Sequence, residues 1–120
     1  MYKINFINLE EDDKDLIASF AIEDSQVGVR SLILHRTLFL EEFLDENERG
    51  VNVSFGGGAD ENEDLDMLEQ IEISINKIKI RSVSSEYQLD VSQIDPAEID
   101  ELVRLLRKQN HDDRFIIHVT

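Results

Sequence analysis

The stretch from Ile71 to Val91 constrains the fold of this chain most, because apolar and polar residues alternate along it almost without interruption. A period of two is typical of β-strands that bury one face. Two-residue turns at Asn76-Lys77 and Ser84-Ser85 fold the stretch into a three-stranded antiparallel meander. A slip of one residue would bury Lys79 and Arg81, so the sequence specifies which face is inward.

Both turns predict the same inward face, which is apolar: Ile71, Ile73, Ile75, Ile78, Ile80, Tyr87, Leu89 and Val91. The predicted register sets several pairs opposite one another: Ile75 and Ile78, Ile73 and Ile80, Glu72 and Arg81, Ile80 and Leu89, Ile78 and Val91, Lys79 and Asp90. Opposite charges that face each other across strands contribute about 0.2–1 kcal/mol each. We therefore expect the outer face of the meander to carry cross-strand charge pairs.

The rest of the chain adds strands and one strong helix. Alternating or continuous apolar runs predict strands over residues 2–9, 16–22, 27–37, 51–55 and 115–119, and Leu40 to Leu44 predicts a short helical turn. Pro96 to Asn110 predicts an amphipathic helix with Asp95 as its N-cap, Glu98 completing a capping box and Asn110 ending it. Its apolar stripe is Ile99, Leu102, Val103 and Leu106, with Asp100 and Arg104 paired outside.

These elements predict an α+β fold: a mostly antiparallel β-sheet with one C-terminal amphipathic helix packed on one face. The length fits a single domain over residues 1–120. Within it, residues 56–66 combine Gly56-Gly57-Gly58 with a run of carboxylates, which cannot form a core. We expect this acidic, glycine-rich loop to be mobile.

The charge of the chain is strongly negative, with a formal net charge of −15. Residues 1–76 carry 19 acidic and 5 basic side chains, whereas residues 77–120 carry 8 and 7. Such a field repels nucleic acid and anionic membranes and attracts basic proteins, although it also serves solubility alone. The chain has no cysteine, no run of apolar residues long enough to span a membrane and no signal-peptide core at its start. We expect a cytoplasmic protein.

Candidate chemistry in the sequence is sparse. Asp60, Asn62 and Asp64 match the first ligands of a calcium loop, but Leu65 and Ile71 occupy the positions that need glycine and glutamate, so a solvated acidic loop is favoured. The three histidines, His35, His111 and His118, lack metal-ligand spacing. The glycine cluster lacks the lysine of a phosphate-binding loop. We expect no cofactor, no metal and no enzymatic activity.

Several segments together resemble a known family. They are Leu32 to Thr37 after an acidic turn, a glycine-bearing segment around Gly50 to Phe55, the run from Leu68 to Ile80, and the run from Asp95 to Leu106. This succession resembles the small acidic immunity proteins of bacterial polymorphic-toxin systems, in particular the tenth numbered immunity family. The loop from Gly56 to Asp66 departs from that pattern. The resemblance implies a non-catalytic, cytoplasmic protein that binds and neutralises a cognate toxin domain.

The charge pattern independently favours a basic protein partner, because toxins that attack nucleic acid present cationic clefts. The candidate partner-binding residues are the carboxylates of three acidic segments: Glu10, Glu11, Asp12, Asp13, Glu41, Glu42, Asp45, Glu46, Asp60, Glu61, Glu63, Asp64 and Asp66. Two alternatives stay open: a DNA mimic that inhibits a nuclease or defence complex, and an accessory subunit of a larger assembly. The latter predicts an exposed apolar patch between Leu38 and Leu44.

Overall fold

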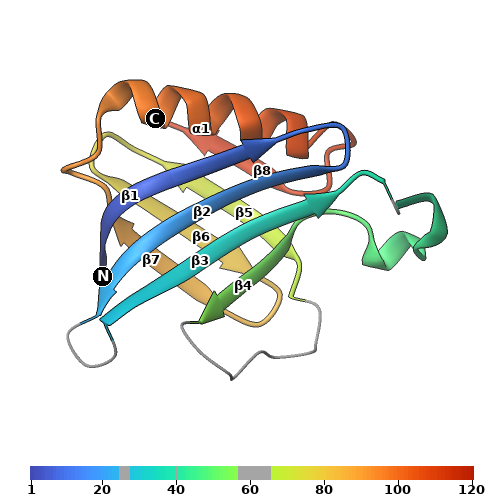
Figure 1. Ribbon diagram of the computed structural model, residues 1–120, viewed down its shortest axis with the longest axis horizontal. Helices are drawn as coiled ribbons and strands as arrows, with labels where there is room; N and C mark the ends of the chain where they lie inside the picture. Colours follow the sequence, from blue (N-terminus) through green and yellow to red (C-terminus); the bar gives the residue numbers. More distant parts are fainter. Residues whose placement is uncertain (25–27, 40, 57–65) are drawn as a thin grey trace.

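The computed structural model describes residues 1–24, 28–39, 41–56 and 66–120, and within these ranges it forms eight strands, two short 3₁₀ turns and one α-helix (Figure 1). The elements in chain order are β1 (Tyr2–Glu11), β2 (Asp15–Asp24), β3 (Gly28–Thr37), η1 (Glu41–Phe43), η2 (Glu46–Glu48), β4 (Asn52–Gly56), β5 (Leu68–Ile73), β6 (Lys77–Ser82), β7 (Glu86–Asp90), α1 (Pro96–Gln109) and β8 (Ile116–Val119). No helix among these residues has the length and apolar character needed to cross a membrane.

The strands form one sheet in the order β4-β3-β2-β1-β7-β6-β5-β8. Neighbours are antiparallel except at two places, where β1 pairs with β7 and β5 pairs with β8 in parallel. The β1–β7 pairing is short and joins only Tyr2 to Leu89 and Lys3 to Asp90. The sheet is therefore made of two halves joined by a narrow seam: β1 to β4 are antiparallel throughout, and β5 to β7 are antiparallel with β8 added in parallel beside β5.

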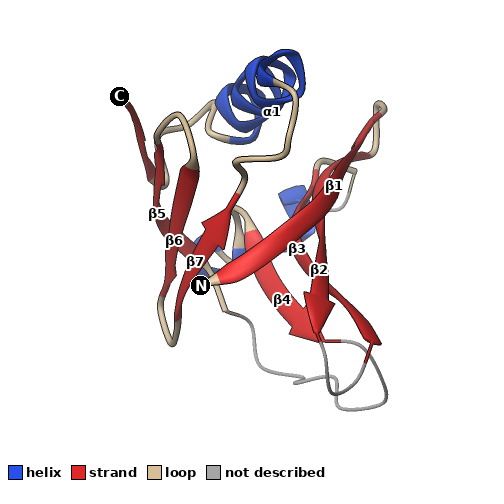
Figure 2. Ribbon diagram, turned by 90° about the vertical axis from the view of Figure 1, so that its left-hand side faces the viewer, coloured by secondary structure: helices blue, strands red, loops and turns tan. Residues whose placement is uncertain are grey.

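The two halves curve toward each other and enclose the core (Figure 2). The far side closes where β4 meets the residues before β5: Val53 N donates to Asp66 O at 2.7 Å and Leu68 N donates to Val51 O at 2.8 Å. The helix α1 covers one end of the space between the halves. Its buried side chains are Leu102, Leu105, Leu106 and Gln109.

The core is built from the inward faces of both halves. Its fully buried large apolar side chains include Ile4, Phe20, Ile22, Leu32, Leu34, Ile71, Ile78, Ile80, Leu89, Leu102 and Leu105. The predicted α+β class, with a mostly antiparallel sheet and a C-terminal helix packed against it, is confirmed. The structure adds that β8 lies at an edge of the sheet, beside β5.

The meander keeps its predicted faces but not its predicted register. Ile73 pairs with Ile78 and Ile80 pairs with Tyr87, so each hairpin is shifted by two residues from the prediction. Both turns begin one residue earlier, at Ile75-Asn76 and at Val83-Ser84. Because a shift of two residues preserves which face is inward, the predicted residues stay inward except for Ile75, which is 86% exposed in its turn; Tyr87 is inward but only half-buried.

Two serines explain the earlier turns. Ser74 donates its hydroxyl to Lys77 O at 3.1 Å, and the Ser82 hydroxyl oxygen accepts a hydrogen bond from Ser85 N at 3.1 Å. Each serine thus closes its turn with a side-chain bond in addition to the backbone bond. The predicted charge pairs change accordingly: Glu72 faces Lys79 and Glu86 faces Arg81, while Lys77 faces Asp90.

The helix matches its predicted bounds closely. Asp95 caps it by accepting a hydrogen bond from Ala97 N at 2.9 Å, and Asn110 ends it. The predicted pair of Asp100 with Arg104 is wrong: Arg104 binds Glu101 on the helix and Glu11 on β1. Of the predicted stripe, Leu102 and Leu106 are buried, whereas Ile99 and Val103 are half-buried. Leu105 and Gln109 are buried in addition, because the helix packs against both β1 and β2.

We expect Asp66 to be a structural residue. Its carboxylate accepts hydrogen bonds from Ser82 Oγ at 2.7 Å and from Ser84 N at 3.0 Å, in the β6–β7 turn. Asp66→Ala should lower the free energy of unfolding by about 1–3 kcal/mol, because it leaves those donors without their charged acceptor. Urea denaturation measures this, with Glu69→Ala, an exposed neighbour on β5, as the control expected within about 0.5 kcal/mol of the unchanged protein. Equal stability of the two variants would contradict the assignment.

Candidate protein-binding surface

The tip of the β1–β2 hairpin is held by an aspartate. The Asp12 carboxylate accepts hydrogen bonds from Lys14 N at 2.8 Å and Asp15 N at 2.7 Å, and Asp12 N donates to Asp15 O at 3.1 Å. These backbone donors hold the pKa of Asp12 below its ordinary value. Glu10 and Asp13 flank this residue and are exposed. The sequence Glu-Asp-Asp-Lys-Asp thus folds as a tight turn that projects part of its charge outward.

The segment after β3 is tied to the same hairpin. Leu38 N and Phe39 N both donate to Lys14 O, at 2.7 and 3.3 Å. The chain then forms η1 and η2. The short helical turn predicted from Leu40 to Leu44 is therefore a 3₁₀ turn over Glu41–Phe43, with Leu40 outside the described residues. A run so rich in adjacent carboxylates offers little apolar surface to hold an α-helix of one turn in place.

Arg36 is the buried residue that joins these segments to the end of the helix. Its side chain has no solvent exposure, and its guanidinium donates to Glu41, with Nε 2.9 Å from Oε2, and to Asp112, with Nη1 2.8 Å from Oδ1. Nη1 also donates to the Gln109 carbonyl at 2.7 Å, at the C-terminal end of α1. One cation therefore links β3, η1 and the chain after α1, in a place where a buried charge requires such partners.

The electrostatics of this cluster follow from its geometry. The hydrogen bond from Arg36, with help from Arg114, holds the pKa of Asp112 well below its ordinary value. Burial alone lowers the pKa of Arg36, but Glu41 and Asp112 outweigh it and raise that pKa. Asp112 also contacts Arg114 Nε at 2.5 Å. Both shifts favour the charged forms of Arg36 and Asp112.

Gln109 fixes the same end of the helix against the sheet. Its buried side-chain nitrogen donates to Leu16 O at 2.9 Å and to Leu34 O at 3.0 Å. Both partners are carbonyls, which sets the orientation of the amide. The side-chain oxygen of Gln109 is buried and has no hydrogen-bond partner among the described residues.

The predicted carboxylates divide into two groups. Four of them bind within the chain: Glu11 pairs with Arg104 and Lys108, Asp12 holds the hairpin, Glu41 binds Arg36, and Asp66 accepts from Ser82 and Ser84. Asp66 lies away from the other three, at the β6–β7 turn. Four further predicted residues, Asp60, Glu61, Glu63 and Asp64, fall outside the described residues, as does most of the loop predicted to be mobile.

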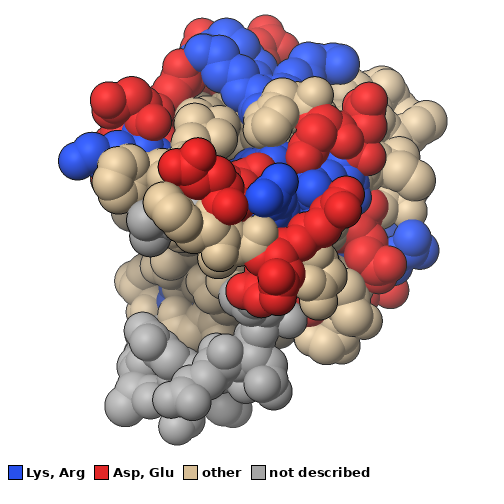
Figure 3. Space-filling view, turned by 90° about the vertical axis from the view of Figure 1, so that its right-hand side faces the viewer, with Lys and Arg blue, Asp and Glu red and all other residues tan. Residues whose placement is uncertain are grey.

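The remaining predicted carboxylates are exposed. They belong to the end of β1, the β1–β2 turn and the η1–η2 segment, which lie on the side of the molecule viewed in Figure 3, where acidic and basic side chains are interspersed. We call this surface the acidic end; it consists of Glu10, Asp13, Glu42, Asp45 and Glu46. Glu46 lies 3.9 Å from Arg114. Across the described ranges, no ion pair is found for the other four.

Two aromatic side chains stand exposed among these charges. Phe39 is 62% exposed and Phe43 is 77% exposed. The Lys14 ammonium lies 5.7 Å from the centre of the Phe39 ring, within the range of a cation–π contact. Both phenylalanines fall in the region from Leu38 to Leu44 where the sequence predicts an apolar patch. A chain that buries Phe20 completely leaves these two in solvent.

The histidines lie in three separate places. His35 Nε2 is 2.8 Å from Asp15 Oδ1, and His118 is exposed on β8. His111, Glu41 and Asp112 place potential ligand atoms within 4.8 Å of one another. Both carboxylates of that group already bind Arg36, whose positive charge opposes a cation there. The group is better described as an arginine-centred ion cluster than as a metal site.

Arg36 and Asp112 are structural residues of this surface that the sequence analysis did not single out. The strand pattern does indicate that Arg36 is inward. Leu32, Leu34 and Arg36 are spaced two residues apart and so lie on the same face of β3, and the two leucines are fully buried. Period-two alternation therefore places Arg36 on the inward face. Its partners come from distant segments, which the strand pattern does not identify.

Comparisons with protein-family models, curated proteins and solved structures give no match for this chain. The resemblance to polymorphic-toxin immunity proteins stays a prediction.

Asp112→Asn should destabilise the protein in a pH-dependent way. Because the folded pKa of Asp112 lies below its unfolded value of about 3.9, its contribution is fully present above that value and is lost as the pH falls toward the folded pKa. The difference in unfolding free energy between the unchanged protein and Asp112→Asn should therefore be largest above about pH 5 and shrink in acid.

Denaturant titrations at several pH values measure this difference. Asp100→Asn is the matched control, since Asp100 is exposed on α1 and has no described ion pair. A difference for Asp112→Asn that stayed constant down to strongly acid pH would contradict the coupling to Arg36.

Proposed function

We propose that this chain is a non-catalytic binding protein that neutralises a basic protein partner, in the manner of a toxin immunity protein, and that it binds through the acidic end. One observation carries the proposal: four exposed carboxylates with no described ion pair meet two exposed phenylalanines on a surface anchored by a buried arginine. They are Glu10, Asp13, Glu42 and Asp45, beside Phe39 and Phe43.

The charges of this surface suit rapid binding to a cationic cleft. A net charge of −15 attracts basic proteins over a distance, and complementary charge raises association rates by about 10- to 1,000-fold. The exposed carboxylates at the acidic end concentrate that attraction at one place. A partner that itself acts on nucleic acid offers the matching positive surface.

The phenylalanines supply what charges alone do not. Affinity at protein interfaces is dominated by a few buried anchors, often aromatic, surrounded by a polar rim. Phe39 and Phe43 occupy such a position among the carboxylates of the acidic end. They also favour the second candidate function, an accessory subunit of a larger assembly, which predicts an apolar contact in this region.

The anchoring of the surface also supports binding. Arg36 ties β3, η1 and the chain after α1 together, so the acidic end loses little conformational freedom when a partner docks. Pre-organisation of this kind increases affinity by reducing the entropic cost of binding.

Neutralising the acidic end should slow association with the partner. The protein, immobilised at low salt, is used to capture a partner from the native lysate, and the captured protein is identified and purified. The combined variant Glu10→Gln, Asp13→Asn, Glu42→Gln and Asp45→Asn should then associate with it about tenfold more slowly or worse at low salt, with a smaller difference at high salt.

A matched variant controls for net charge. It neutralises four exposed carboxylates outside the acidic end: Glu23, Glu69, Glu86 and Asp100. This control should retain most of the association rate. Equal slowing by both variants would mean that total charge matters and the acidic end does not. The identity of the partner separates a toxin from a nuclease, a defence complex or an assembly.

Phe43→Ala should act on dissociation instead of association. Loss of a central aromatic anchor costs about 2 kcal/mol, so the dissociation rate should rise about 30-fold. Because Phe43 is 77% exposed, the stability of the free protein should change by less than about 0.5 kcal/mol. Ile75→Ala, at an exposed turn residue of the meander, is the control. An unchanged dissociation rate for Phe43→Ala would exclude the aromatic contact and leave a purely electrostatic interface.

A further inference from the structure

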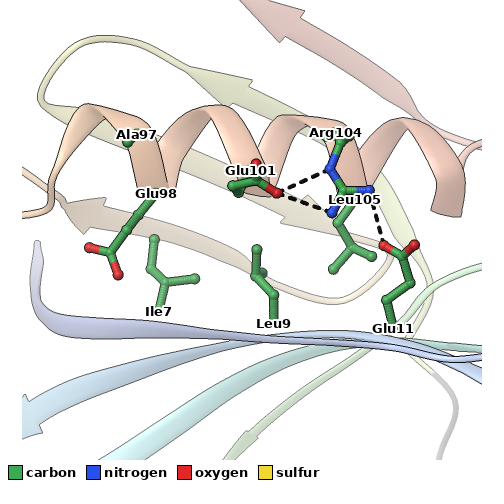
Figure 4. A pocket seen from close by; sticks show the side chains of 8 residues that line it. All are labelled: Ile7, Leu9, Glu11, Ala97, Glu98, Glu101, Arg104 and Leu105. Carbon is green, nitrogen blue, oxygen red and sulfur yellow. Dashed lines mark hydrogen bonds and ion pairs between the residues drawn. The ribbon is translucent and has the colours of Figure 1, made fainter.

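A groove lies between α1 and the strand β1 (Figure 4). Its volume is about 470 Å³, within the range of about 300–1,000 Å³ that is typical of ligand pockets. Ile7 and Leu9 form its apolar floor on the side of β1, and Leu105 contributes from α1. Glu11 and Arg104 meet at one end of it, through a 3.1 Å ion pair. The groove is thus long, apolar at its base and charged along its rim.

The strand beside the groove has an open edge. On one side β1 pairs with β2 from Ile4 to Glu11, but on the other side β7 pairs only with Tyr2 and Lys3. From Ile4 onward, no strand of the described chain occupies that side. An unpaired strand edge presents backbone donors and acceptors that can accept a further strand.

The hairpin shows which backbone groups face this edge. Asp12 N donates to Asp15 O, so Asp12 and Asp15 form a hydrogen-bonded pair. Such pairs alternate along an antiparallel ladder, so Glu10 and Asn8 direct their backbone groups toward β2. The backbone groups of Ile7, Leu9 and Glu11 therefore point to the open edge, and the side chains of the same residues line the groove.

The rim of the groove is acidic. Its lining includes three carboxylates, Glu11, Glu98 and Glu101, and one guanidinium, Arg104. Glu101 and Glu11 share Arg104, whereas Glu98 is exposed on α1 and no described residue forms an ion pair with it. The groove therefore favours a segment with basic side chains and disfavours an acidic one.

We propose that this groove binds an extended segment of a basic protein partner, which adds a strand to the open edge of β1. The side chains of the segment that enter the groove are lysine or arginine: their aliphatic stems contact Ile7, Leu9 and Leu105, and their charged ends reach Glu98 and Glu101. The alternate side chains point to the opposite face of the sheet, away from α1. The backbone of the segment pairs with Ile7, Leu9 and Glu11. This mode of recognition takes affinity from the backbone and specificity from alternate side chains.

The inference deepens the proposed function, since it assigns a second contact to the same basic partner, and Glu11 places the groove next to the acidic end. The two contacts use different residues. A test on the groove with a peptide leaves Glu10, Asp13, Glu42 and Asp45 unaltered, so failure of one proposal is distinguishable from failure of the other.

The probe is the capped peptide Val-Lys-Val-Lys-Val, with Val-Glu-Val-Glu-Val as the charge control. Amide hydrogen exchange read by NMR follows the backbone of β1. The lysine peptide should slow exchange at Ile7, Leu9 and Glu11 by about tenfold at saturation, because hydrogen-bonded amides exchange only on local opening. The glutamate peptide should leave these amides unchanged.

N-methylation of the peptide tests backbone pairing without altering the protein. One version carries methyl groups on the valine amides and the other on the lysine amides, which lie on opposite edges of an extended peptide. Only one of the two sets should weaken binding, by about tenfold. Equal binding of both versions, or slowed exchange at the edges β4 or β8 in place of β1, would overturn the proposal.

Two protein variants test the rim. Glu98→Lys should weaken the lysine peptide about tenfold, whereas Asp100→Lys, a matched charge reversal at an exposed position of α1 that does not line the groove, should not. Equal effects of the two reversals would overturn the role of the groove. If amide exchange at Ile7, Leu9 and Glu11 slowed as the protein concentration was raised without peptide, the strand that pairs with β1 would come from a second copy of the chain. That result would overturn the proposal of a basic partner.

Discussion

The contact between Arg36 and its acceptors is the interaction that holds together the end of β3, η1 and the chain after α1. A guanidinium without solvent exposure binds two carboxylates from separate segments and the Gln109 carbonyl at the end of α1. Taking such a charge out of water is costly unless every donor is satisfied. Moving either carboxylate away would leave a buried charge uncompensated and destabilise the fold. The same contact fixes where η1 and the chain after α1 lie. It therefore shapes the surface on which Glu42, Asp45 and Phe43 are displayed.

A second constraint is the incomplete closure of the sheet. The sheet is closed at β4 by backbone bonds to the residues before β5, but the seam between β1 and β7 involves only the first residues of β1. The helix covers the opening and buries Leu102 and Leu105 there. Because a helix cannot satisfy the hydrogen bonds of a strand edge, this arrangement protects the core and leaves the backbone of β1 open. The groove is a direct consequence of that compromise.

The sequence predicts much of this fold, because the alternation of apolar and polar side chains along each strand shows which face is buried. In the meander, alternation identified nearly every buried residue, and the two-residue error in register left Ile73, Ile78 and Ile80 inward. What alternation does not specify is the position of each turn, where Ser74 and Ser82 each form a side-chain hydrogen bond that closes the turn. Likewise, composition located the acidic segments, but only the three-dimensional structure distinguishes Glu11, bound to α1, from Glu10, which faces solvent.

That distinction bears on how an acidic protein can be both stable and ready to bind. Glu11 pairs with Arg104 and Lys108, which offset its charge, while Asp12 and Asp66 satisfy uncharged donors within the chain. Among the described residues no ion pair is found for Glu10, Asp13, Glu42 and Asp45, so in a chain with a net charge of −15 an approaching cation would relieve their repulsion. A basic partner would therefore bind where the protein gains most from it. The unequal distribution of internal partners, more than the total charge, argues for a specific surface over a merely soluble one.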